Sequence, residues 1–242
     1  MPSSAPGRPA LPGLVAGALA DAAGVTGLAW LATSRLDVSR EYTASALGIF
    51  VLAVGAAGVA LLRHHAHDRF GAANQVTLLR AALVSLLAAL VPQVPSAPAA
   101  WAVVVTAVLL AMLDGLDGWL ARRSRLSSPF GAAFDMETDA ALVLVLSLLV
   151  WTHQKAGAWV LACGVMRYGF GAARWLLPWM RGRLTPTRRG RAVAVLQYFG
   201  LAAAIAPAVP YPASAAVAVV TLAVLAWSFG LDVGRLWRQR AH

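Results

Sequence analysis

Residues 114–139 read DGLDGWLARRSRLSSPFGAAFDMETD, and they contain five of the chain's ten acidic residues, four of them aspartates. The acids stand at the ends of strongly apolar segments, where a charge is costly and usually functional. Asp114 and Asp117 are three residues apart, and Asp135 and Asp139 are four apart, so each pair shares one face of a helix. Two such helices side by side would direct four carboxylates toward one point.

Four carboxylates at close quarters repel one another unless a cation neutralises them or some stay protonated. An all-oxygen ligand set suits Mg²⁺ or Mn²⁺, and Mg²⁺ is usually held by a few carboxylates together with substrate phosphates. The stretch therefore predicts a divalent metal site. The alternative is that these aspartates cap helices or face headgroups and water.

Other residues of the same stretch suit a phosphorylated ligand. Gly118 and Ala121 are small and leave room for a bulky group to approach the backbone. Arg122 offers a guanidinium fork that matches phosphate oxygens. Ser128 precedes Pro129, which predicts a turn followed by the start of the next helix.

The order Asp114, Asp117-Gly118, Ala121-Arg122, Gly131, Asp135 and Asp139 resembles the signature of the CDP-alcohol phosphatidyltransferases, and every signature position is filled. The resemblance runs from about Asn74 to the C-terminus. It implies an all-α, polytopic membrane bundle with a six-helix core and a homodimer. It also implies transfer of a phosphatidyl group from CDP-diacylglycerol to an alcohol, with release of CMP.

The resemblance further assigns roles to residues. Metal ions would be held by the four signature aspartates, and Asp139 would also be the general base that takes the acceptor's proton. The expected CDP-lipid-binding residues are Asn74, Thr77, Arg80, Gly118, Ala121, Arg122, Ser128 and Gly131.

The composition agrees with a membrane protein, because 60% of the 242 residues are apolar and 12% are charged. A net charge of +10 would also fit a nucleic-acid-binding protein, but the basic residues follow the membrane sides and no recognition motif is present. Anionic lipid headgroups and phosphorylated substrates are the expected partners. Apolar segments predict eight spans, at 14–33, 44–62, 76–91, 101–121, 133–152, 158–179, 192–208 and 213–231.

The loops between these spans predict the orientation. Most arginines fall in loops on one side, whereas the opposite loops carry one lysine and the mixed stretch SRLDVSRE at residues 34–41. By the positive-inside rule, both termini and the aspartate stretch face the cytoplasm. We expect the plasma membrane of a bacterium.

Residues 1–70 are expected to be a two-helix membrane extension with an interfacial linker, and residues 71–242 the six-helix domain. A signal peptide is the alternative for the first apolar segment, but Asp21 interrupts it and no cleavage site follows.

Asn74, Thr77 and Arg80 match an Asn-x-x-Thr-x-x-Arg element that opens the first core helix in the family and helps to hold the CDP-linked substrate. The alternative is that Asn74 or Thr77 only caps that helix. Arg80 needs an anionic partner in either case.

The acceptor is predicted less directly. Arg167 lies within a span and is a candidate for binding the acceptor's phosphate, as are Arg188 and Arg191 in the loop that follows. Residues 190–197, GRAVAVLQ, are similar to a Gly-Lys-x-Lys-Thr-x-x-Gln element of members that act on glycerol phosphate, but Val193 and Ala194 replace the second lysine and the threonine.

Glycerol 3-phosphate is the leading candidate for the acceptor, and this choice rests mainly on the element that contains Asn74, Thr77 and Arg80. Inositol phosphate and phosphatidylglycerol are the alternative acceptors. Two other classes of function are open. The first is a non-catalytic membrane protein that binds a cation or a nucleotide lipid in the acidic site. The second is a transporter, which would be expected to show inverted repeats.

Overall fold

The structure, a computed structural model, describes residues 10–64, 70–124, 128–182, 184 and 187–240, without the side chains of residues 63, 64, 117, 121, 122 and 124. Within these residues the chain forms eight α-helices and no strand. The helices are α1 (Leu11–Arg35), α2 (Tyr42–His64), α3 (Ala72–Leu90), α4 (Ala97–Ser124), α5 (Pro129–Thr152), α6 (Ala162–Leu176), α7 (Arg188–Ile205) and α8 (Ala213–Gln239). The predicted all-α architecture is confirmed.

Five of the described helices are long and apolar enough to cross a membrane by length and composition, namely α1, α2, α3, α4 and α8. Helix α5 contains three carboxylic acids in its first half, and α7 has three arginines among its first four residues. These charges lower the mean hydropathy of both helices.

The predicted span 158–179 is not one continuous helix. A 3₁₀ turn at Ala158–Leu161 precedes α6, and a second 3₁₀ turn follows at Pro178–Arg181. Pro178 has no N–H group and its ring clashes with the preceding turn, so α6 ends before it. At about 1.5 Å per residue, the 15 residues of α6 extend about 22 Å, less than the roughly 30 Å of a bilayer's hydrocarbon core.

The chain divides into two compact units. The first contains α1, α2 and α3, with α4 from Leu109 onward and α5 up to Asp139. The second contains Ala100–Val108 of α4, the rest of α5 from Ala140, and α6 to α8. These two units are defined by packing and do not test the predicted domain boundary between residues 70 and 71. That boundary stays a prediction.

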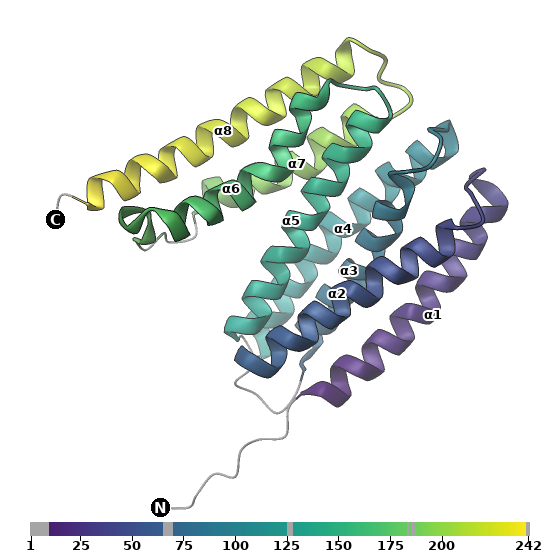
Figure 1. Ribbon diagram of the computed structural model, residues 1–242, viewed down its shortest axis with the longest axis horizontal. Helices are drawn as coiled ribbons and strands as arrows, with labels where there is room; N and C mark the ends of the chain where they lie inside the picture. The colour runs from purple at the N-terminus through teal and green to yellow at the C-terminus, as the bar shows by residue number, and fades with distance from the viewer. Residues whose placement is uncertain (1–9, 65–69, 125–127, 183, 185–186, 241–242) are drawn as a thin grey trace, which may run out of the picture. The chain divides into compact units, whose positions relative to one another are not determined.

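Helices α1, α2 and α3 pack against one another in the first unit (Figure 1). Helix α3 is the most enclosed of the five candidate spans, because 67% of its apolar stretch is buried. The phenol of Tyr42, at the start of α2, donates a hydrogen bond of 3.0 Å to the carbonyl of Leu86 in α3. A buried helix with polar side chains near its first turn is suited to hold those side chains rigidly.

In the second unit, α7 and α8 lie side by side (Figure 1). The buried amide of Gln197 donates a 2.8 Å hydrogen bond to the carbonyl of Thr221, and Gly200 lies directly against the Thr221 side chain. Small residues and buried polar groups of this kind typically hold membrane helices together, because apolar contacts alone gain little in lipid.

Candidate functional site

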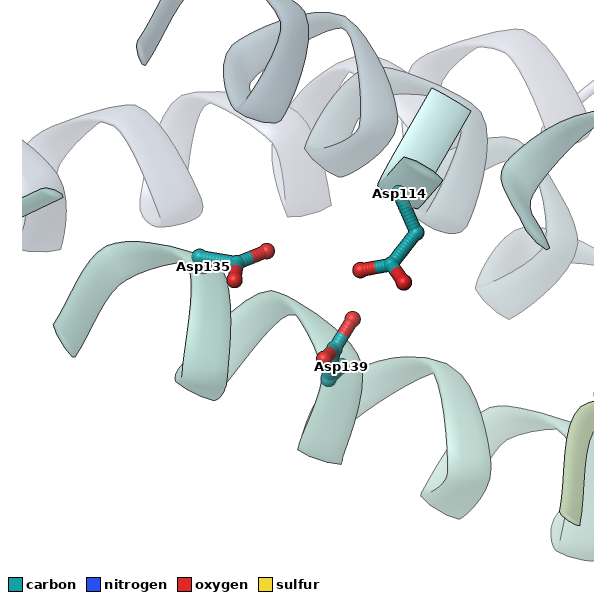
Figure 2. Close-up of side chains that lie close together, drawn as sticks. All are labelled: Asp114, Asp135 and Asp139. Carbon is teal, nitrogen blue, oxygen red and sulfur yellow. The ribbon is translucent and has the colours of Figure 1, made fainter. Parts of the chain in front are cut away.

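Three aspartates from two helices converge in the first unit. Asp114 comes from α4, whereas Asp135 and Asp139 come from successive turns of α5, and their carboxylates point toward one another (Figure 2). One oxygen from each carboxylate lies within 4.8 Å of the corresponding oxygen of the other two. We call these three residues the carboxylate cluster. All three lie well inside their helices, so the part of the alternative in which they cap helices is wrong for these three.

A buried arginine lies among the three carboxylates. Arg80 of α3 is 1% exposed, and its Nη2 atom is 3.0 Å from an oxygen of Asp114. Its guanidinium also forms ion pairs with Asp135 and Asp139. The carboxylate side chains are 29–39% exposed, so the cluster is closed by Arg80 on its buried side and accessible elsewhere.

The charge of this arrangement fits a divalent cation. Three carboxylates and one guanidinium leave a net charge of −2 when all are ionised. The cluster's donor atoms are all carboxylate oxygens, which suit hard cations such as Mg²⁺ and Mn²⁺. The residues present therefore fit a bound divalent metal ion.

The first turns of α3 and α5 are in close contact beside the carboxylate cluster. Ser128 caps α5, because its Oγ accepts a 3.0 Å hydrogen bond from the backbone N–H of Gly131. Gly131 lies against the side chain of Asn74, so that a Cβ at this glycine would be only 2.7 Å from Asn74 Oδ1. The Asn74 amide in turn donates to the carbonyl of Phe70. These predicted CDP-lipid-binding residues are thus brought together.

Asn74, Thr77 and Arg80 are all buried on α3. Thr77 donates a 3.1 Å hydrogen bond to the carbonyl of Ala73 within the helix. The N-cap of α3 is Gly71, whose φ of 78° favours glycine, and no side chain caps this helix. The alternative that Asn74 or Thr77 serves only as a helix cap is therefore wrong.

The remaining signature positions lie on α4. Gly118 is half-buried in this helix. The side chains of Asp117, Ala121 and Arg122 lie outside the described part of the structure, so the predicted fourth metal ligand and the predicted phosphate contacts stay predictions.

An apolar groove of about 300 Å³ lies on another part of α5. Alanines of α2 form one wall, Phe130 and Phe134 form the other, and Glu137 is the charged residue among those that line it. At 100° per residue, Glu137 lies on the opposite side of α5 from Asp135 and Asp139. The groove is therefore distinct from the carboxylate cluster.

The three arginines predicted to bind the acceptor's phosphate belong to the second unit. Arg167 is half-buried on α6, and Arg188 and Arg191 are exposed on the first turn of α7. Their neighbour Arg189, which was not among the predicted site residues, forms an ion pair with Asp232 of α8. Asp232 is an isolated acid in a basic C-terminal segment, and this contrast in charge could have indicated an ion pair from the sequence.

One comparison with known proteins identifies a family that covers this site. The model of the CDP-alcohol phosphatidyltransferase family matches residues 70–229, about two thirds of the 242-residue chain, and includes the carboxylate cluster and Arg80. No curated protein and no solved structure matches the chain. With its apolar helices, the chain is thus a multi-pass membrane protein. It belongs to the CDP-alcohol phosphatidyltransferase family.

Proposed function

We propose that the protein transfers a phosphatidyl group from CDP-diacylglycerol to glycerol 3-phosphate at the carboxylate cluster, with release of CMP. Family membership makes it a transferase of phospholipid biosynthesis that acts on a CDP-linked alcohol. The observation that carries the site assignment is the convergence of Asp114, Asp135 and Asp139 around a buried arginine. The donor lipid and the acceptor are the finer parts of the proposal.

The carboxylate cluster would hold Mg²⁺ or Mn²⁺, with Asp117 as the predicted fourth ligand. When bound, the metal offsets the negative charge of the substrate's diphosphate. Arg80 restrains the three carboxylates through its ion pairs and keeps them oriented between α3, α4 and α5. Preorganised charge of this kind lowers the reorganisation needed during phosphoryl transfer.

Asp139 is proposed as the general base. Its carboxylate takes the proton from the acceptor hydroxyl, whose oxygen attacks the phosphorus attached to the diacylglycerol. The bond from that phosphorus to the oxygen of the cytidine monophosphate breaks, and CMP leaves with the electron pair. Positioned general bases typically contribute about 10² to 10⁴-fold to a rate, so alignment of the substrates supplies much of the remainder.

The nucleotide and phosphates of the donor are proposed to contact Gly118, Arg122 and Ser128, beside Asn74 and Gly131. Arg167, Arg188 and Arg191 are the proposed contacts for the acceptor's phosphate. We place the carboxylate cluster and both termini on the cytoplasmic side of a bacterial plasma membrane, and we propose a homodimer. The distribution of arginines supports this orientation.

The test is CMP release by the purified protein from CDP-diacylglycerol with Mg²⁺ or Mn²⁺. Glycerol 3-phosphate, inositol phosphate and phosphatidylglycerol are supplied one at a time. We expect release with glycerol 3-phosphate and its loss on chelation. Release with only one of the other acceptors would refute the proposed acceptor. A lack of release with all three, although CDP-diacylglycerol binds, would count against the proposed reaction.

A further inference from the structure

Helix α1 lies outside the region that matches the family, yet it packs directly onto the start of α3. At Gly13 the two segments are so close that a Cβ on this glycine would be 2.9 Å from the Cβ of Phe70. That contact involves an atom next to the backbone, so a larger residue at position 13 would have to displace α1 or the segment before α3.

A second contact lies one turn further along α1. A Cβ on Gly17 would collide with the side-chain amide of Gln75, the residue after Asn74. The same amide donates a 2.8 Å hydrogen bond from Nε2 to the carbonyl of Gly13. Glycines four residues apart commonly allow membrane helices to approach closely, and here Gly13 faces Phe70 and Gly17 faces Gln75.

These contacts continue into the proposed CDP-lipid site. The ring of Phe70 lies 6.2 Å, centroid to centroid, from the ring of Phe130 in the first turn of α5. The carbonyl of Phe70 also accepts a hydrogen bond from Asn74, whose Oδ1 lies against Gly131. A displacement at Gly13 would therefore be transmitted through Phe70 to Asn74 and to the start of α5.

We propose that α1 positions the active site. Gly13 and Gly17 allow this helix to pack against Phe70 and Gln75. This packing holds Asn74 in place against Gly131. The inference rests on the proposed function for the role of Asn74 in substrate binding. It gives the N-terminal extension a task in the reaction beyond anchoring the chain. Gly13, Gly17 and Gln75 are positioning residues, because they act through Asn74 and touch no reacting atom.

The experiment compares Gly13→Val with Gly27→Val. Both changes place the same residue inside α1, but a Cβ at Gly27 would have no neighbour within 4 Å. Both variants add the same side chain to α1, but only at Gly13 does it meet Phe70. The measurements are kcat and KM for CDP-diacylglycerol, equilibrium binding of the same lipid, and thermal unfolding. Gly13→Ala is the milder variant if Gly13→Val does not fold.

A distance measurement makes the test independent of activity. Spin labels at Leu19→Cys on α1 and Leu79→Cys on α3, both exposed positions, would report the spacing of the two helices in a Cys163→Ser background. We expect Gly13→Val to lengthen this distance by about 1–2 Å, the range over which side-chain size alters helix spacing. Gly27→Val should leave it unchanged.

The expected kinetic result is a fall in kcat/KM on the order of 10²-fold for Gly13→Val, mainly through KM, because a misplacement of about 1 Å has an effect of this size. Gly17→Ala should show a smaller loss, because its Cβ meets the far end of the flexible Gln75 side chain and not an atom next to the backbone. A longer helix distance with unchanged KM and lipid binding would overturn the proposed positioning. If the wild-type protein releases no CMP, the proposed reaction fails, and binding of CDP-diacylglycerol still tests the positioning.

Discussion

Replacement of Arg80 by methionine tests the electrostatics of the carboxylate cluster. Methionine retains much of the apolar stem but removes the guanidinium, and the three carboxylates are left with their oxygens within 4.8 Å of one another. Removing one partner from a buried ion pair costs about 3–5 kcal/mol. The carboxylates are 29–39% exposed, so solvent screening lowers this cost, and we expect a loss of about 2–4 kcal/mol in the free energy of unfolding.

The loss should depend on the divalent cation. Without the guanidinium, the three carboxylates carry a net charge of −3 instead of −2, so the variant should bind Mn²⁺ more tightly than the wild type. Mn²⁺ stabilises both proteins, and each tenfold tighter Kd adds about 1.4 kcal/mol to the variant at saturating Mn²⁺, so the difference from the wild type should shrink. Asp135→Asn added to Arg80→Met should also restore part of the loss, since one repelling charge is removed.

The assay is denaturant unfolding in detergent micelles, with and without Mn²⁺, for the wild type, Arg80→Met and Arg80→Met/Asp135→Asn. The matched control is Arg235→Met, because Arg235 is half-exposed and lies 3.7 Å from Asp232. We expect the control to change stability by less than about 1 kcal/mol. Equal stability of Arg80→Met and the wild type, with no response to Mn²⁺, would refute the reasoning.

Two further predictions concern other contacts. Gly131→Ala should raise KM for CDP-diacylglycerol, because the new Cβ would lie 2.7 Å from Asn74 Oδ1, whereas Gly55→Ala on α2 meets nothing within 4 Å and should not change KM. Burial and the nearby Lys155 lower the pKa of His153 from its ordinary value of 6.5. The folded state thus favours the neutral imidazole. The contribution of His153 to the free energy of unfolding is therefore present in full above pH 6.5 and is lost as the pH falls from 6.5 toward the lowered pKa. Unfolding measured across this range should show a smaller loss for His153→Gln; identical pH profiles would contradict the prediction.

The family, the all-α fold and the enzyme class were predictable from the sequence and are confirmed. Helical spacing is the physical reason that the acid pair of α5 could be assigned to one face, because Asp135 and Asp139 are separated by about one turn. Ser128 and Pro129 likewise indicated the start of α5, where serine caps the helix. Such features depend on residues that are near one another in the chain.

Contacts between distant segments were not predictable in this way. Arg80 is 34 residues before Asp114 and 59 before Asp139, and only the general need of a buried arginine for an anion indicated an ion pair. The contact of Gly131 with Asn74 also depends on how α3 and α5 pack. The end of α6 before Pro178 is different, because the proline was a local signal that the long apolar run outweighed in the predicted span.

The roles assigned to individual residues in the reaction stay predictions, and Asp139 is the most direct point at which to test them. Asp139→Asn should be compared with Glu137→Gln, a carboxyl-to-amide change on the same helix that faces the apolar groove. The measurement is CMP release from CDP-diacylglycerol with the acceptor and Mn²⁺, together with equilibrium binding of the CDP-lipid. We expect Asp139→Asn to abolish turnover and largely to retain CDP-lipid binding, whereas Glu137→Gln should retain both. Unchanged turnover in Asp139→Asn would contradict the role of Asp139 as the general base.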